Sequence, residues 1–347
     1  MNQKILVDIK ALNSILSSKN KTSYVMNDGW LKINKGACIG IVGESGSGKT
    51  QLFKTISGTQ EMIPGIVSGE VTFQFNNEKL NMYENKNGKY KLSKYHKAVK
   101  KDLIGFIPQD PKSYLNPYWT IKKIFKQTYR LRKQNIGFED FIQNYLSQVD
   151  IDSNLYQNKL PGQLSGGEAQ RVMIALVLSK QPKLIIADES TTGLDVSRQR
   201  KVIDTFKEIH LSNPDLTMIF ISHDFGFLSH VVDEYYVLYG GFICEHITSK
   251  KQFSNFNNLH PYTQDLISSL IPGQNKKDIS MHDEVSSSLL SAPLIGCPYF
   301  NVKCQDKDCN EQSHFHNKIP PMFDDKGNSS NINLNNSWKR SRLKNDK

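Results

Sequence analysis

The feature that most constrains the fold is a glycine-rich stretch at residues 43–50. It matches the phosphate-loop pattern G-x-x-x-x-G-K-[ST] at every position, with the residues Gly43, Glu44, Ser45, Gly46, Ser47, Gly48, Lys49 and Thr50. An apolar run at 37–42 precedes it and a helix-forming run at 51–56 follows it. In such a loop the backbone N–H groups turn inward around phosphate oxygens, and the helix N-terminus adds positive potential. The pattern therefore predicts an α/β fold with a nucleoside triphosphate site.

Two side chains of this loop carry chemistry. We expect Lys49 to reach the β- and γ-phosphates and the Thr50 hydroxyl to bind Mg²⁺. An ordinary glycine-rich turn is the alternative, but the complete pattern between a strand and a helix disfavours it. Upstream of the loop, Tyr24 could stack on a purine ring, because aromatic faces suit that contact. It could also be an ordinary sheet tyrosine, and the sequence leaves both interpretations open.

Length and composition narrow the class of protein. With 347 residues, of which 38% are hydrophobic, the chain can form one large domain and an appendage. No apolar run approaches the ~20 residues that cross a bilayer, so we expect no transmembrane helix. The run at 5–9 is typical of a strand and not of a signal peptide, which predicts a cytoplasmic protein. The net charge is +10, but the lysines are scattered among asparagines, which favours a solvated surface over nucleic-acid binding.

Three strand-like runs after the loop each end in polar side chains. The first run ends at Gln109, whose amide could bond the Mg²⁺ shell or the attacking water. The second ends at Asp188 and Glu189. Asp188 suits Mg²⁺ coordination, and Glu189 suits polarising a water for in-line attack. The third ends at His223, which could donate to the γ-phosphate and sense its loss. Downstream of a phosphate loop, these residues are predicted to form a catalytic set.

A second helix start could also bind an anion. The stretch 164–171 opens a helix with a serine and two glycines but no lysine, and its candidate residues are Leu164, Ser165, Gly166, Gly167, Glu168 and Gln170. A short turn further on carries Asp195, an acid that could link two active sites. Between 120 and 155 the apolar residues follow helical spacing, which predicts an all-helical insertion.

In this order and spacing, the motifs resemble those of the ABC-type ATPase domain over about the first 250 residues. The resemblance implies a P-loop NTPase core of the RecA-like type with an antiparallel β subdomain, a helical subdomain at about 112–165 and a C-terminal extension. It places the ATPase domain at 1–255 and the extension, with a flexible tail, at 256–347. Two such domains pack head to tail in this family. The stretch 164–171 corresponds to the signature motif of this family. The signature motif of one subunit would therefore cap the ATP that is held by the other subunit. We expect that other subunit to be a homologous protein and not a second copy of this chain.

Three further runs, at 106–111, 115–117 and 260–264, are similar to the ATPases that energise peptide and nickel import, of the oligopeptide and dipeptide permease type. This resemblance implies an ATP-hydrolysing subunit bound peripherally at the cytoplasmic face of the cell membrane. Its partners would be two membrane permease subunits and, indirectly, an extracellular solute-binding protein that delivers peptides. Ser190 and Gly193 replace the family's usual proline and alanine, and both changes leave the chemical groups intact.

The C-terminal extension carries three cysteines, Cys297, Cys304 and Cys309. In relatives the extension can carry four cysteines that hold an iron–sulfur cluster, and the fourth is missing here. His314 or His316 could supply a nitrogen ligand to a cluster or to zinc. We favour three reduced thiols without metal over either alternative.

Other functions remain open on the sequence. The chain could serve an importer of nickel or another small solute. A soluble ABC protein that acts on ribosomes or DNA is disfavoured, because such proteins usually join two ATPase domains or insert long coiled coils. A subunit that binds ATP without hydrolysing it is disfavoured because the motif residues Lys49, Asp188, Glu189 and His223 are intact.

Overall fold

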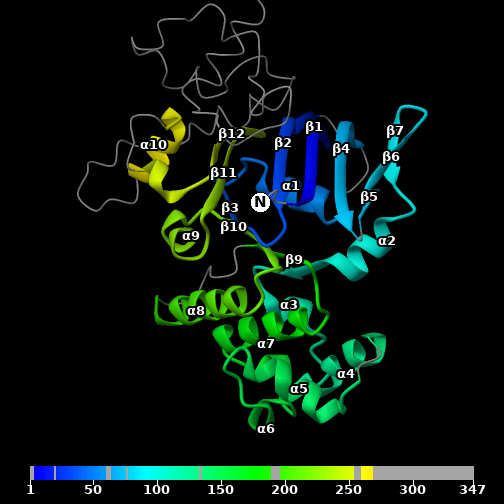
Figure 1. The fold of residues 1–347 in the computed structure, drawn as a ribbon, viewed down its shortest axis with the longest axis vertical. Coiled ribbons are helices and arrows are strands. Elements are labelled where there is room, and N and C mark those ends of the chain that lie inside the picture. The colour runs from blue at the N-terminus through cyan, green and yellow to red at the C-terminus, as the bar shows by residue number, and fades with distance from the viewer. Residues whose placement is uncertain are drawn as a thin grey trace, which may run out of the picture.

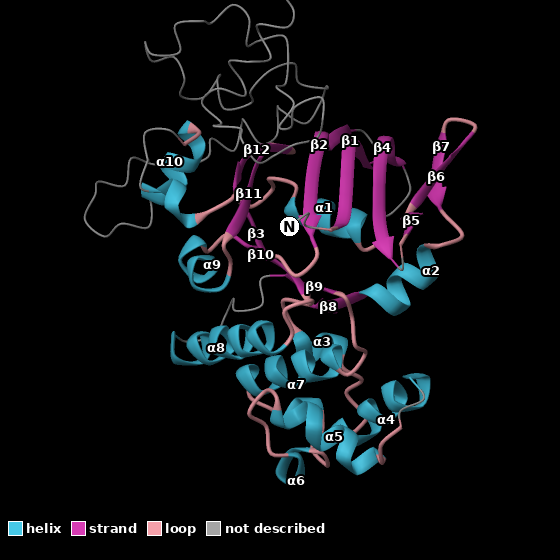
Figure 2. Ribbon diagram, viewed as in Figure 1, coloured by secondary structure: helices cyan, strands magenta, loops and turns pink. Residues whose placement is uncertain are grey.

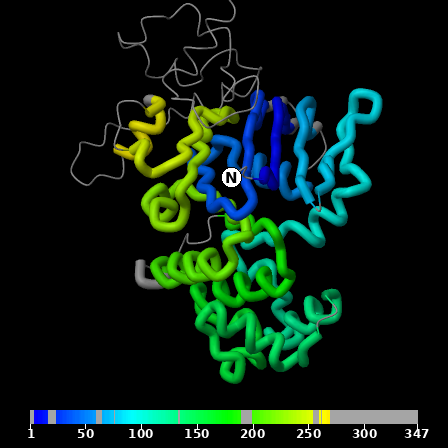
Figure 3. Tube along the Cα trace, in the orientation of Figure 1, coloured from blue at the N-terminus to red at the C-terminus, as the bar shows by residue number. Residues whose placement is uncertain are grey.

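The computed structural model describes residues 4–18, 21–59, 64–75, 77–132, 135–188, 196–253 and 259–268. They form a central sheet, an antiparallel sheet, a two-stranded hairpin and several helices (Figure 1, Figure 2). Figure 3 traces the chain from the antiparallel sheet, in blue and cyan, into a green helical layer and back to the central sheet.

The central sheet has the strand order β12-β11-β3-β10-β9-β8. Its strands are β3 (Cys38–Val42), β8 (Ile104–Ile107), β9 (Leu184–Asp188), β10 (Thr217–Ser222), β11 (Glu234–Tyr239) and β12 (Phe242–Ile247). All neighbours pair in parallel except β11 and β12, which are antiparallel. In the register, Ser222 lies opposite Val42 and Ile221 lies opposite Asp188. The carboxyl ends of β3, β9 and β10 therefore meet at one edge of the sheet.

The two faces of this sheet belong to two hydrophobic cores. Along β3, Ile39 and Ile41 pack in one core, and Cys38 and Val42 pack in the other. This alternation follows from the two-residue period of a strand. Because both faces are covered, the strands consist of nearly continuous apolar runs, which is typical of parallel sheets.

The antiparallel sheet covers one of these faces and has the order β2-β1-β4-β5. Its strands are β1 (Ile5–Ser18), β2 (Lys21–Asn34), β4 (Pro64–Phe75) and β5 (Glu78–Asn81). The segment 17–23 is polar, yet β1 extends to Ser18, β2 begins at Lys21, and the two strands pair up to these residues. Serine, threonine and tyrosine fit a half-solvated strand. Polar composition alone therefore did not mark the ends of these strands.

A lysine-rich hairpin extends from this region, formed by β6 (Tyr83–Lys86) and β7 (Lys89–Leu92). Asn87 and Gly88 form its turn with φ of 54° and 77°. Positive φ at both central residues is what a two-residue hairpin turn of this kind needs, and Asn-Gly supplies it at low cost. The Asn-Gly pair is therefore a sequence signal for this turn.

The helices flank the central sheet and form a separate layer beyond it (Figure 1). Helix α1 (Lys49–Ile56) follows the phosphate loop, and α2 (His96–Ala98) with the π-helix η1 (Val99–Leu103) precedes β8. The layer between β8 and β9 contains α3 (Pro111–Tyr114), α4 (Ile121–Arg132), α5 (Phe138–Ser147), α6 (Ser153–Tyr156), the 3₁₀-helix η2 (Pro161–Gln163) and α7 (Gly166–Leu178). The remaining described helices are α8 (Val196–Ser212), α9 (Phe225–Val231) and α10 (Pro261–Ser268).

Helix α10 packs into the hydrophobic core on one face of the central sheet. Its residues Tyr262 and Leu266, with the preceding Leu259, are buried in the same hydrophobic cluster as the helical layer. The expected division into an ATPase domain at 1–255 and an extension at 256–347 stays a prediction, because residues 269–347 lie outside the described residues. In the described part of the chain, every helix is too short or too polar to cross a membrane.

Candidate nucleotide-binding site

The phosphate loop fits between three backbone segments. A Cβ on Gly43 would lie 2.2 Å from the carbonyl oxygen of Leu238, and one on Gly48 would lie 2.5 Å from that of Val25. Gly48 also adopts a φ of +105°, which side chains of L-residues rarely accept. The amide of Gly241 donates to the carbonyl of Ser47 at 3.0 Å. The loop is thus held from β2, β11 and the turn after β11.

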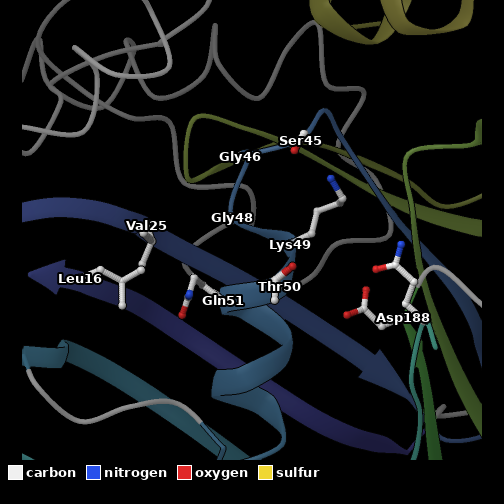
Figure 4. Close-up of a pocket in the computed structure, with 10 residues that line it drawn as sticks. Leu16, Val25, Ser45, Gly46, Gly48, Lys49, Thr50, Gln51 and Asp188 are labelled. Carbon is white, nitrogen blue, oxygen red and sulfur yellow. The ribbon is translucent and has the colours of Figure 1, made fainter. Parts of the chain in front are cut away.

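Lys49 points back into the loop that precedes it. Its ammonium donates to the carbonyl oxygens of Gly43 and Glu44, both at 2.7 Å. The side chain is 7% exposed, so these contacts lie largely out of water and hold the charge in one place. Figure 4 shows Lys49 and Thr50 at the start of α1, facing the same space as Asp188.

A cavity of about 460 Å³ opens beside this loop. Among the described residues, its lining consists of Leu16, Val25, Ser45, Gly46, Gly48, Lys49, Thr50, Gln51, Gln109 and Asp188. The sequence predicted Lys49, Thr50, Gln109 and Asp188 as site residues, and the structure brings these four together. They come from three elements separated by many residues, namely the start of α1, the segment after β8 and the end of β9.

The oxygen donors in this cavity fit a Mg²⁺ ion. Magnesium prefers oxygen ligands and is usually bound by one or two carboxylates together with the phosphates of a substrate. Thr50, Gln109 and Asp188 offer a hydroxyl, an amide oxygen and a carboxylate. No group of three or more His, Cys, Asp or Glu side chains in the described residues could hold a metal ion. The donor set suits an ion that is shared with a phosphate ligand.

The other end of the cavity is apolar. Leu16 and Val25 line it, and they lie on the paired strands β1 and β2. Tyr24 is half-buried in β2 but is not among the described lining residues. The described lining at this end is therefore aliphatic, and the stacking of Tyr24 on a purine ring stays a prediction. The sequence analysis did not single out Leu16, which lies with Ile15 between polar residues.

The other predicted site residues either do not line the cavity or fall outside the residues that the structure describes. His223 is exposed after β10 and is not among the described residues that line the cavity. Glu189 and Asp195 fall outside the described residues, as do Cys297, Cys304, Cys309 and the two candidate histidines of the C-terminal extension, His314 and His316.

The signature segment forms the start of α7. Ser165 is the N-cap: its hydroxyl accepts from the Glu168 amide at 3.3 Å, and the Glu168 carboxylate accepts from the Ser165 amide at 2.7 Å. The Tyr156 hydroxyl also donates to Glu168, at 2.7 Å. This bond and that from Ser165 lower the pKa of Glu168 to about 2. The spacing of serine and glutamate is that of a capping box, a signal that the sequence contained.

The signature residues differ in their access to a second molecule. Gly166 is exposed and Ser165 is half-buried, whereas Leu164, Gly167 and Gln170 are buried. Gln170 is only 2% exposed because α7 is apolar on most of its surface. Its side chain therefore packs within the chain in this structure. No residue of 164–170 is among the described residues that line the cavity.

A phosphate loop after the central parallel strand β3, facing the Asp188 carboxylate at the end of β9, two strands away in the same sheet, defines a nucleotide-binding α/β protein. The family model described as ABC transporter matches residues 26–192. The oligopeptide transport ATP-binding protein OppF of Haemophilus influenzae is 30% identical, over 92% of this chain and 91% of that protein. AppF of Bacillus subtilis, with the same description, is 33% identical over 84% and 85%. The chain therefore belongs to the ATP-binding proteins of the ABC transporter family.

Other similar proteins agree with this assignment. The dipeptide transport ATP-binding protein DppD of Haemophilus influenzae is 35% identical over 76% of this chain and 77% of that protein. A solved component of the ABC transporter complex CbiONQ from Clostridium perfringens covers 77% of this chain and 100% of that chain, with a TM-score of 0.60 and 21% identity. A dimeric ATP-binding cassette bound to ADP and Pi covers 70% and 97%, with a TM-score of 0.57 and 23% identity. The predicted family and fold are confirmed.

Proposed function

We propose that this chain is the ATP-hydrolysing subunit of an importer that carries peptides across the cell membrane. The observation that supports this most directly is the convergence of Lys49, Thr50, Gln109 and Asp188 on one cavity. A lysine, a hydroxyl and a carboxylate around a glycine-rich loop are the groups that phosphoryl transfer requires.

Each residue has a distinct part in this chemistry. The Lys49 ammonium would stabilise negative charge on the β- and γ-phosphates, and Thr50, Asp188 and Gln109 would hold a Mg²⁺ ion. When bound, Mg²⁺ neutralises phosphate charge as a Lewis acid. Glu189, which follows Asp188, orients or deprotonates the water. That water attacks the γ-phosphorus, the bond to the bridging oxygen breaks, and ADP and phosphate leave. His223 senses the loss of the γ-phosphate.

The working unit is a head-to-tail dimer with a homologous subunit. Gly166, at the start of α7, is exposed. The described residues that line this chain's own cavity include none from the start of α7. A helix start of this kind favours an anion, so it is suited to the γ-phosphate of a nucleotide on a second chain. The partner's phosphate loop would supply that nucleotide.

The transported solute follows from the relatives. Those that match most of this chain are named as oligopeptide or dipeptide transport proteins. The chain would dock on two permease subunits at the cytoplasmic face of the membrane. A solute-binding protein outside the cell would deliver the peptide.

Hydrolysis is tested on the purified full chain with Mg-ATP by phosphate release. Asp188→Asn should reduce turnover by about 10²-fold or more, because it removes a charge from the metal site. Asp152→Asn is the control, since Asp152 is an exposed N-cap on α6, away from the cavity. Equal turnover of Asp188→Asn and wild type would contradict the proposed role.

Transport is tested on the complex isolated from native membranes with a tagged chain. Two multi-spanning permeases and a second ATPase should co-purify. In vesicles, ATP turnover by this complex should rise with peptide-loaded binding protein and not with nickel salts. Co-purification of ribosomes in place of permeases would overturn the transport function, and stimulation by nickel alone would overturn the choice of peptide.

A further inference from the structure

Helix α10 reaches the phosphate loop from the other end of the described chain. The Glu44 amide donates a hydrogen bond of 3.0 Å to the Tyr262 hydroxyl, across 218 residues of sequence. Tyr262 is 1% exposed, so this contact lies in the protein interior, where a hydrogen bond is stronger than in water. Tyr262 lies in the run 260–264, which the sequence analysis found similar to the ATPases of peptide and nickel importers without assigning it a role.

The same peptide group also binds the catalytic lysine. The amide of Glu44 and the carbonyl of Gly43 belong to one peptide unit. The amide donates to Tyr262, and the carbonyl accepts from the Lys49 ammonium at 2.7 Å. A peptide that donates through its N–H becomes a better acceptor at its carbonyl, because hydrogen bonds in a chain polarise one another. Tyr262 is therefore linked to Lys49 through a single peptide group.

Tyr262 is itself held by Tyr239 and His260, and His260 is held in turn by Glu245; we call these four residues the α10 anchor. The rings of Tyr262 and Tyr239 lie with centroids 4.6 Å apart. The Tyr262 amide donates to Nδ1 of His260 at 3.1 Å. The two carboxylate oxygens of Glu245, in β12, each accept from the His260 amide at 3.1 Å. The hydroxyl of Tyr262 thus has a fixed position.

The protonation states agree with these roles. Burial, with the nearby Glu44 carboxylate, raises the pKa of Tyr262, so the phenol stays neutral. Burial lowers the pKa of His260 to about 4. The imidazole is therefore uncharged near pH 7, and its Nδ1 can accept the hydrogen bond from the Tyr262 amide.

We propose that Tyr262 is a positioning residue for nucleotide binding, whose hydroxyl fixes the Gly43–Glu44 peptide and through it the Lys49 ammonium. This rests on the proposed function, since it assumes that Lys49 binds the phosphates of ATP. It also makes α10 a part of the nucleotide site and not a piece of the C-terminal extension. Without the hydroxyl, the peptide loses its hydrogen bond to α10 and holds the Lys49 ammonium less firmly, although the Glu44 carbonyl still accepts from it.

The test is the affinity of the full chain for a fluorescent ATP analogue. Tyr262→Phe keeps the buried ring and removes the hydroxyl. A neutral hydrogen bond contributes about 1 kcal/mol, so binding should weaken about fivefold. Tyr235→Phe is the matched control. Tyr235 is also buried, stacks on Phe225 with centroids 4.8 Å apart and bonds a backbone carbonyl through its hydroxyl. This control should bind as wild type does.

A double-mutant cycle separates positioning from general stability. If Tyr262 acts through Lys49, Tyr262→Phe should change affinity less than twofold in a Lys49→Ala background. Fivefold losses in both backgrounds would overturn the proposal, as would wild-type affinity of the single variant Tyr262→Phe. Wild-type protein that fails to bind ATP would instead overturn the proposed function.

A second measurement tests the contact without nucleotide. In hydrogen exchange of the free protein, the amide of Glu44 should exchange faster in Tyr262→Phe than in wild type, and Tyr235→Phe should leave it unchanged. Equal exchange at Glu44 in all three proteins would show that the hydroxyl does not hold this peptide.

Discussion

The pH dependence of stability should be set in part by Glu245, a buried carboxylate in β12. It is 1% exposed, and burial raises its pKa from 4.5 to about 7. The folded protein therefore keeps a proton that the unfolded chain releases between these two values. The stabilising contribution is fully present below about pH 4.5 and is lost as the pH rises through about 7. One pKa unit corresponds to about 1.4 kcal/mol, so the full loss is on the order of 3 kcal/mol.

Glu245→Gln tests this value, because glutamine stays neutral and still offers an oxygen to the His260 amide. Urea unfolding of the full chain should be followed from pH 5 to pH 8 for the variant and for wild type. The unfolding free energy of the variant should rise relative to that of wild type by about 3 kcal/mol over this range. Glu78→Gln, at an exposed position in β5, is the control. Parallel pH profiles for Glu245→Gln and wild type would refute the reasoning.

Three further outcomes concern the nucleotide site and the cysteines. Glu189→Gln should bind ATP but hydrolyse it about 10²- to 10⁴-fold more slowly, and should elute as an ATP-bound dimer in size-exclusion chromatography; near-normal phosphate release would assign the water to another group. Gly166→Asp places a carboxylate at the exposed start of α7, where the γ-phosphate of the partner's ATP would dock. The isolated chain should therefore bind ATP normally, but its phosphate release should stop. Loss of ATP binding by the isolated chain would contradict this role. Anaerobically purified protein should be colourless and free of stoichiometric iron and zinc, because three cysteines fall short of the four that usually hold a cluster; a brown protein with bound iron would show otherwise.

Much of the site could be predicted because its motifs are short and its strands are parallel. The phosphate loop fixes Lys49 and Thr50 within eight residues, and the parallel strands of the central sheet end at the same edge. Gln109 and Asp188 could therefore be assigned to this edge from the ends of their strands. The same rule also selects His223, which is not among the described residues that line the cavity. The capping box of Ser165 and Glu168 was readable in the same way, since it needs only a fixed spacing.

Contacts between distant segments could not be predicted in this way. Nothing in the spacing of residues 260–264 indicates that Tyr262 meets Glu44, because that contact depends on how α10 packs against β11 and β12. The aliphatic surface of Leu16 was missed for a related reason. Its place beside the loop depends on the length of the β1–β2 hairpin, and the polar residues there resemble a surface connection.

The position of β3 in the central sheet has a consequence for the synthesis of the protein. Its neighbours are β10 and β11, and Cys38 pairs with Met218, about 180 residues later. At ~5–20 residues per second, the ribosome takes about 10 to 40 seconds to deliver the first of these neighbours. Until then, an apolar strand has no partner in its own sheet and is exposed to aggregation. We expect the nascent chain to depend on a chaperone or on the early β1–β2 hairpin to shield β3 during that interval.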